Sequence, residues 1–277
     1  MEKKMAALVE LPSPIVAETK ISVRGITKRF AHGREQLTAL QAIDLEVRRG
    51  EFLCVVGPSG CGKSTLLHII AGLEKPLGGE VRIDDIPTNG PGPDRILIFQ
   101  DLGLFPWLSV RENVEFGLKM KGLSRRERAD RARHFIRLVH LSQFENSYIH
   151  QLSGGMRQRV SLARALALAP SVLLMDEPFT ALDAQTRDLL HDELERIWAE
   201  TRQTILFVTH NVREAVRLGD RVVVMTYRPG RIKREFGIEL DRPRALEDPE
   251  VAAQAAEILA ELRGEIDQAV RAEYSHA

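Results

Sequence analysis

The chain has 277 residues, which is enough for one large domain or for one domain with an appendage. Its 39 Lys and Arg residues balance its 39 Asp and Glu residues, so no global basic field marks a nucleic-acid-binding protein and we expect no nucleic-acid partner. No uninterrupted apolar run is long enough to cross a bilayer, so we expect any function at a membrane to depend on a partner protein.

The N-terminal segment and the cysteines set further limits. Residues 1–20 are predicted to form an extended lead-in rather than a signal peptide, because two glutamates and two prolines flank a short apolar patch. Cys54 and Cys61 lie too close together, on a rigid path from strand to loop, to favour a structural disulfide. This cysteine usage fits a reducing cytosol.

Two early segments alternate apolar with polar residues and predict half-buried antiparallel strands, Ile21 to Phe30 and Ala42 to Val47. Phe30 ends the first of them. Its ring could stack on an adenine base, and the alternative is an ordinary core phenylalanine.

A glycine-rich segment follows the apolar run Phe52 to Val56 and precedes an apolar helical pattern. Its residues are Gly57, Pro58, Ser59, Gly60, Cys61, Gly62, Lys63, Ser64 and Thr65. Strand, glycine-rich turn and helix are the context of a phosphate-binding P-loop, whose backbone N–H groups and helix start attract phosphate. We expect Lys63 to reach the β- and γ-phosphates and the Ser64 hydroxyl to ligate Mg²⁺. The alternative is a glycine turn that only caps a helix.

The next elements lead to a polar strand end. Glu80 to Asp84 predicts a short strand, and Arg95 to Phe99 predicts a second fully buried strand with Gln100 at its end. Asp101 to Leu108 carries more aromatic and apolar side chains than a turn normally exposes.

Three helices are predicted in the middle of the chain. They cover Val110 to Lys121, Ser124 to His140 with a charged and solvated face, and a segment from Ser153 to Ala169. Ser153 has the position of an N-cap, and Gly154 and Gly155 follow where the backbone must approach another group closely.

An acidic pair ends the apolar strand predicted over Val172 to Met175. Asp176, at the end of a buried strand beside a P-loop, is placed to hold Mg²⁺, usually through water. Glu177 points elsewhere, so we expect it to act as the general base that orients and deprotonates an attacking water. The alternative is an acidic pair at the surface.

The remaining elements alternate strand and helix, which implies a parallel sheet with helices on both faces. A helix ends near Thr201, and a strand over Ile205 to Val208 ends before His210. Because ligands bind at the carboxyl edge of such sheets, Gln100 could contact both metal and water, and His210 could bind the γ-phosphate and steady Glu177. A solvated Gln and a structural His are the alternatives.

The C-terminal region begins with a helix over Val212 to Leu218 and a strand over Arg221 to Met225. Tyr227 to Leu240 contains the turn Arg228-Pro229-Gly230-Arg231 between two strand-like runs. The tail predicts a packing or dimer-stabilising helix that Asp248 and Pro249 begin. Its apolar face comprises Val251, Ala255, Ile258, Leu262 and Ile266.

Together these residues resemble the ATP-binding subunit of an ABC (ATP-binding cassette) transporter. The decisive segment is Leu152-Ser153-Gly154-Gly155, which we call the signature. It joins GPSGCGKST, Gln100, VLLMDEP, Ala181-Leu182-Asp183 and His210 in the family's order. The resemblance implies an α/β P-loop ATPase core over residues 21–240, with an N-terminal antiparallel β subdomain, a helical subdomain at about 101–168 and a helical extension over 241–277.

The resemblance also implies a head-to-tail homodimer. Ser153 and Gly155, with Gly154 between them, would contact the γ-phosphate of ATP held by the partner chain, and Asp183 would lie at the dimer seam. Phe30 matches the aromatic residue that stacks on adenine. ATP would close the dimer and hydrolysis would open it. Met156 stands where many members carry Gln, so no amide hydrogen bond to ribose is expected from that side chain.

A narrower resemblance is to importers of nitrate, sulfonates, taurine and related small solutes such as bicarbonate. It rests on FPWLSVRENV, LSGGMRQR, MDEPFTALDAQTR, FVTHNVREAV and RPGRI. It implies transmembrane permease subunits, an extracytoplasmic solute-binding protein, and a position on the cytoplasmic face of the inner membrane. Phe105 and Trp107 would then form a docking surface for the permease, the alternative being that Trp107 plugs the helical subdomain.

Two other classes compete with an importer ATPase. A soluble ABC ATPase acting on DNA or ribosomes is less favoured, because no sustained heptads separate Lys63 from Ser153 and the chain holds one cassette. A non-hydrolysing scaffold is disfavoured by Glu177. Cys61, inside the loop, is expected to react with alkylating agents unless ATP protects it.

Overall fold

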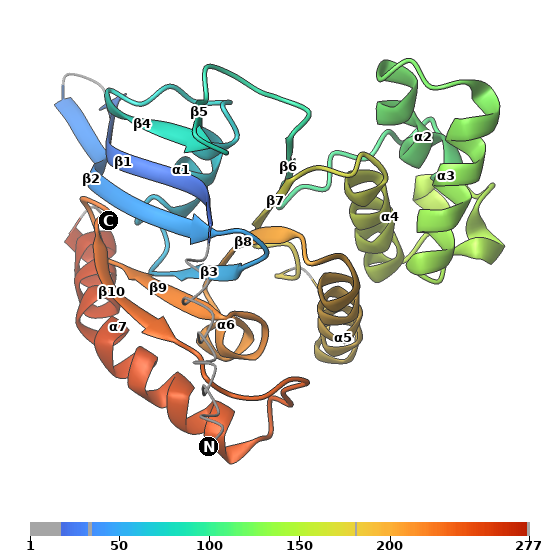
Figure 1. Cartoon of the computed structure of the whole chain (residues 1–277). Helices are drawn as coiled ribbons and strands as arrows, with labels where there is room; N and C mark the ends of the chain where they lie inside the picture. The colour runs from blue at the N-terminus through green and yellow to red at the C-terminus, as the bar shows by residue number, and fades with distance from the viewer. Residues whose placement is uncertain (1–17, 33–34, 181, 276–277) are drawn as a thin grey trace, which may run out of the picture.

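The structure, a computed structural model, describes residues 18–32, 35–180 and 182–275. Most of the expected lead-in and Ala181 therefore lie outside the described residues. A six-stranded sheet in the order β10-β9-β3-β8-β7-β6 forms the centre (Figure 1). All neighbouring strands are parallel except β10, which is antiparallel to β9. The strands are β3 (Phe52–Val56), β6 (Arg95–Ile98), β7 (Val172–Asp176), β8 (Thr204–Thr209), β9 (Arg221–Met225) and β10 (Ile232–Gly237).

A second, antiparallel sheet has the order β2-β1-β4-β5. Its strands are β1 (Thr19–His32), β2 (Glu35–Arg48), β4 (Gly78–Ile83) and β5 (Ile86–Pro87). The alternating residues of the sequence place one face inward: Ile21, Val23 and Ile43 are almost completely buried. This confirms the predicted N-terminal antiparallel subdomain.

The central sheet is buried on both faces, which is why β3 is apolar without interruption. Leu53 and Val55 pack with the antiparallel sheet and with α1 (Lys63–Ile70). Phe52 and Cys54 point to the opposite face and share a core with the helices there. Those helices are α5 (Ala184–Thr201), α6 (Val212–Leu218) and α7 (Pro249–Ser275).

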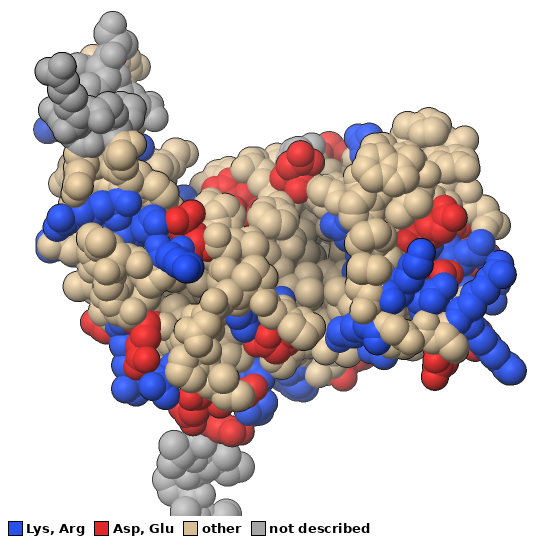
Figure 2. Space-filling model, turned by 90° about the horizontal axis from the view of Figure 1, so that it is seen from above, with Lys and Arg blue, Asp and Glu red and all other residues tan. Residues whose placement is uncertain are grey.

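A separate group of helices stands beside the core and is called the helical lobe here (Figure 1). It comprises α2 (Val110–Met120), α3 (Arg125–Leu138), α4 (Gly154–Ala167) and two short 3₁₀ helices, η1 (Ser142–Phe144) and η2 (Ile149–Gln151). Ser109 and Ser124 begin α2 and α3 with complete capping boxes. Figure 2 shows Lys and Arg side chains interspersed with Asp and Glu on this lobe, as expected of a solvated charged face.

Two details of the expected burial are wrong. In β6, only Ile98 is fully buried, and Phe99 beyond it is 41% exposed, because β6 is the edge strand of the sheet. In α7, Ile266 is 41% exposed. There the buried stripe continues through Glu265 and Ala269, so the turn of the helix carries Ile266 away from the core.

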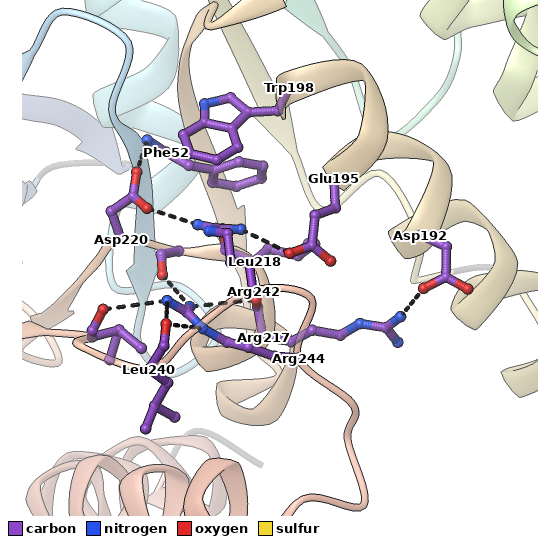
Figure 3. A network of polar contacts seen from close by, with 12 residues as sticks. Phe52, Asp192, Glu195, Trp198, Arg217, Leu218, Asp220, Leu240, Arg242 and Arg244 are labelled. Atoms are coloured by element: carbon purple, nitrogen blue, oxygen red, sulfur yellow. Dashed lines mark hydrogen bonds and ion pairs between the residues drawn. The ribbon is translucent and has the colours of Figure 1, made fainter. Parts of the chain in front are cut away.

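Two arginines join the end of α6 to the segment that precedes α7 (Figure 3). Arg244 is 4% exposed and donates to the carbonyls of Val216, Gly219 and Leu240, at 2.8, 2.6 and 2.7 Å. It therefore satisfies carbonyls that the last turn of α6 leaves unpaired. Burial lowers the pKa of Arg244 to about 10. The Arg242 guanidinium lies 4.4 Å from the ring centre of Trp198.

Candidate active site

Four neighbouring parallel strands deliver the predicted residues to one edge of the sheet. Strand β3 leads into the P-loop, β8 ends just before His210, β7 ends at Asp176, and β6 ends two residues before Gln100. Their order β3-β8-β7-β6 makes these ends adjacent. The carboxyl edge of such a sheet is where ligands bind in open α/β folds.

The P-loop borders a groove of about 430 Å³, called the nucleotide groove here. Phe30, Lys63, Gln100 and Glu177 are among its lining residues. Gly62 has φ +104° immediately before α1, and a Cβ there would come within 2.6 Å of a Leu40 side-chain carbon. Glycine is therefore required at this turn by both conformation and space.

Lys63 is 5% exposed and donates to the carbonyl oxygens of Gly57 and Pro58, at 2.8 and 3.0 Å. Its Nζ also lies 3.9 Å from a carboxylate oxygen of Glu177. The ammonium is thus held within the loop, and binding to phosphate would replace two carbonyl acceptors by charged ones.

Ser64 and Asp176 form the pair expected at a magnesium site. The Ser64 hydroxyl donates to Asp176 Oδ1 at 3.0 Å. Burial raises the pKa of Asp176, and the hydrogen bond from Ser64 acts in the opposite direction. A hydroxyl and one carboxylate fit Mg²⁺, which binds few protein oxygens beside substrate phosphates. Within the described ranges, no cluster of three or more His, Cys, Asp or Glu side chains could hold a metal. Gln100 shares the groove, and its metal contact stays a prediction.

Glu177 and His210 contact each other. The Nδ1 of His210 lies 2.8 Å from Glu177 Oε2, and because the carboxylate accepts, Nδ1 carries the hydrogen. Glu177 has φ +44°, and its backbone N–H donates to the carbonyl of Val208 at 3.0 Å. Such a conformation costs about 1–3 kcal/mol and is held by the surrounding structure, as is common at functional sites. The pair can orient a water and accept its proton.

The signature begins α4, as the N-cap pattern predicts. The Ser153 hydroxyl accepts from the backbone N–H of Met156 at 3.3 Å. The structure describes the signature residues Ser153, Gly154 and Gly155. None of them lines the nucleotide groove. They belong instead to the helical lobe (Figure 1). The chain therefore does not bring its signature to its own P-loop.

The signature is packed against the start of α5. A Cβ on Gly155 would lie 2.4 Å from the side-chain Cγ2 of Thr186, so a larger residue there would require the Thr186 side chain to move. Asp183 is the N-cap of α5 and accepts from the Thr186 backbone N–H at 2.9 Å. That hydrogen bond is the main cause that lowers the pKa of Asp183.

Arg228 is a groove residue that the sequence analysis missed. Its Nε donates to the carbonyl of Gly60 at 3.0 Å, and its side chain lines the nucleotide groove. The sequence showed only a turn at this position. The close fit of this turn to the P-loop is visible at Gly230, where a Cβ would lie 2.1 Å from the carbonyl oxygen of Cys61.

The exposure of two side chains decides one expectation, that Cys61 is reactive, and one alternative, that Trp107 plugs the helical subdomain. Cys61 is completely buried, and burial raises the pKa of its thiol, so ready alkylation is not expected. Trp107 is 70% exposed, so it does not plug the helical lobe. The Phe105 ring packs on Phe116, with ring centres 4.4 Å apart, and lies 5.7 Å from Trp107. Cys54 and Cys61 are both free, as predicted.

A glycine-rich loop between a buried strand and a helix, with paired acids at the neighbouring strand end, defines a P-loop nucleotide-binding protein. Residues 40–180 match the family described as ABC transporter. The chain belongs to the ABC transporter family and is one of its ATP-hydrolysing, ATP-binding proteins.

Relatives match over most of the chain. An uncharacterized ABC transporter ATP-binding protein of Methanocaldococcus jannaschii is 51% identical over 90% of this chain and 93% of its own length. The nitrate import ATP-binding protein of Synechocystis is 48% identical over 79% of this chain and 83% of its own. The taurine import ATP-binding protein of Burkholderia pseudomallei is 46% identical over 83% and 88%.

The fold is also similar to a solved structure. An ATP-binding cassette in a dimeric, post-hydrolysis state bound to ADP and Pi has a TM-score of 0.72 and 37% identity. The match covers 80% of this chain and 100% of that one. This agrees with the predicted ABC ATPase fold of antiparallel sheet, mostly parallel core and helical lobe.

Proposed function

We propose that this chain is the ATP-hydrolysing subunit of a membrane importer, in which ATP-driven closure of a homodimer is coupled to uptake of a small solute. The solute we propose is an anion or zwitterion such as nitrate, a sulfonate, taurine or bicarbonate. The observation that carries the proposal is the position of the signature, outside its own nucleotide groove. A second copy facing head to tail could supply it. The nitrate and taurine import relatives support the solute class.

In this proposal each site residue has one task toward ATP. Phe30 stacks on adenine. Lys63 and the backbone N–H groups between Gly57 and Thr65, other than at Pro58, bind phosphates. Ser64, Asp176 and Gln100 hold Mg²⁺. The metal supplies neutralising charge at the phosphate oxygens. Glu177 orients and deprotonates the attacking water, and His210 keeps that carboxylate in place.

The partner copy completes the site. Ser153, Gly154 and Gly155 of one chain bind the γ-phosphate held by the other, since a helix N-terminus attracts phosphate. Asp183 then lies at the seam between the copies. ATP bound by both chains stabilises the closed dimer, and hydrolysis removes that link.

The membrane partner would be a permease that receives solute from an extracytoplasmic binding protein. In the part of the chain that the structure describes, no helix is long and apolar enough to span a bilayer. We propose that the exposed Trp107, with the half-buried Phe105 beside it, docks on the permease at the cytoplasmic face of the inner membrane. The division into residues 21–240, with a helical subdomain at about 101–168, and an extension over 241–277 remains part of the proposal.

Glu177→Gln tests the catalytic assignment. It should abolish hydrolysis, retain ATP binding and yield a stable ATP-dependent dimer, measured by light scattering after size-exclusion chromatography. Adding Lys63→Ala to the same chain should prevent the dimer, because nucleotide binding is then weakened. Undiminished hydrolysis by Glu177→Gln would remove Glu177 as the base.

Co-purification from detergent-solubilised membranes tests the transport assignment. We expect a multi-span apolar partner, identified by mass, in a two-to-two or two-to-one ratio. Recovery of soluble partners or ribosomes alone would instead favour a soluble ABC ATPase, while leaving the hydrolysis chemistry intact.

A further inference from the structure

A buried polar network lies behind His210 and has no part in the site described so far. His191 on α5 is completely buried, and Glu214 on α6 is 5% exposed. The Nε2 of His191 lies 2.6 Å from Glu214 Oε1, and the Thr209 hydroxyl donates to Glu214 Oε2. Buried polar groups of this kind are expensive unless they are fully hydrogen-bonded, so their arrangement is strongly specified.

The direction of the hydrogen bonds follows from the fixed donor at one end. Arg217 can only donate, and its Nη1 lies 3.5 Å from Nδ1 of His191. Nδ1 is therefore the acceptor, Nε2 carries the hydrogen, and His191 donates to the Glu214 carboxylate. Arg217 is itself anchored to Asp192, as Figure 3 shows, by a 2.5 Å hydrogen bond. Hydrogen-bond donation thus runs from Arg217 on α6 through His191 on α5 to the carboxylate of Glu214.

The same carboxylate fixes the backbone on both sides of His210. Thr209 immediately precedes His210, and its hydroxyl, while donating to Glu214, accepts from the Asn211 backbone N–H at 3.0 Å. Asn211 in turn caps the first turn of α6, accepting from Glu214's backbone N–H at 3.4 Å. The peptide that carries His210 is therefore held at the residue before it and at the residue after it.

We propose that Thr209, Glu214 and His191 are positioning residues for hydrolysis: they hold His210 where its Nδ1 meets the Glu177 carboxylate. Because Asp183 is the N-cap of α5, His191 also ties the position of His210 to the helix at the proposed dimer seam. The proposal rests on the function proposed above for Glu177 and His210. It assigns a role to residues that do not touch ATP.

Thr209→Val is the test, because it removes the hydroxyl and keeps the shape of a buried strand residue. Thr204→Val is a matched control. Both threonines lie on β8 and are 2% exposed, but Thr204 is at the other end, where its hydroxyl accepts from the backbone N–H of Gly50 at 2.9 Å. Thr209→Ser restores the hydroxyl without the methyl group. ATP hydrolysis and thermal unfolding are measured for all three variants.

Thr209→Val should lower kcat about tenfold or more, because small displacements of catalytic groups have large effects on rate. Its KM for ATP should stay within about twofold of the wild-type value, because no nucleotide contact is lost. Thr209→Ser should recover most of the rate, and Thr204→Val should lower Tm while keeping kcat within about twofold of wild type. If Thr209→Val does not fold, Thr209→Ala gives the same comparison.

Equal kcat values for Thr209→Val and Thr204→Val would overturn the proposal, as would failure of serine to restore a lowered rate. Glu177→Gln separates this result from the parent assignment. If Glu177→Gln abolishes hydrolysis and Thr209→Val does not slow it, only the positioning network is refuted. If Glu177→Gln hydrolyses ATP normally, both assignments are wrong.

Discussion

Phe30→Ala should weaken nucleotide binding by an amount that follows from the exposure of the ring. Phe30 lines the nucleotide groove, is 39% exposed, and has the Lys28 ammonium 5.0 Å from its ring centre. A phenylalanine buries ~150–250 Å² when covered, so the exposed share is about 60–100 Å². At about 25 cal/mol per Å², covering it with adenine gives about 1.5–2.5 kcal/mol, within the range measured for base stacking. The Kd for ADP should therefore rise about 10- to 70-fold.

Isothermal titration with ADP measures this change without requiring hydrolysis. Phe144→Ala is the control, because Phe144 is 38% exposed but lies on η1 in the helical lobe. It should leave ADP affinity unchanged, and Phe30→Trp should retain most of the affinity because stacking tolerates a different ring. An ADP affinity of Phe30→Ala equal to that of Phe144→Ala would show that Phe30 is an ordinary surface aromatic.

Three further outcomes are expected. Arg228→Ala should raise the KM for ATP about fivefold, because an exposed cation beside the phosphates is lost. Arg231, whose guanidinium donates to Gln41, provides the control, and Arg231→Ala should leave the KM unchanged. Equal KM values for the two variants would refute the role of Arg228. Burial raises the pKa of Glu193, so its ionised form destabilises the folded state at neutral pH. Glu193→Gln should therefore raise Tm by a few degrees at pH 7. This gain in Tm should vanish as the pH falls below about 4.3, because the carboxyl is then protonated in the unfolded state as well. Trp107→Ser should leave ATP hydrolysis by the isolated chain unchanged and reduce recovery of the permease; unchanged recovery would exclude Trp107 from docking.

Local signals in the sequence were sufficient to locate most elements. The predicted bounds of β3, α6 and β9 agree with the structure, because continuous apolar runs and an N-cap mark them. The P-loop and the Asp176 pair could be found for the same reason. Each of these two motifs follows a buried apolar strand and carries its polar residues at the end of that strand. The same short stretch of sequence therefore indicates both where the residues lie in the fold and what they can bind.

The features that the sequence did not reveal depend on long-range packing. Arg228 contacts a loop residue 168 positions away, and nothing near Arg228 in the chain indicates that contact. The exposure of Phe99 depends on strand order, which alternating elements alone do not specify. His191 lies on a helix that was correctly expected, but its partner Glu214 is on another helix, so only the fold brings the pair together.

The arginines after β10 bear on where the chain can be shortened for expression. Ending it at residue 240 would remove Arg244, leaving carbonyls at the end of α6 without their donor, and would remove the guanidinium of Arg242 from Trp198. It would also remove Val251 and Ile258, which share the main core with the ATPase sheet. A fragment cut at the edge of the recognisable cassette would therefore expose apolar surface and tend to aggregate, and residues through α7 should be kept.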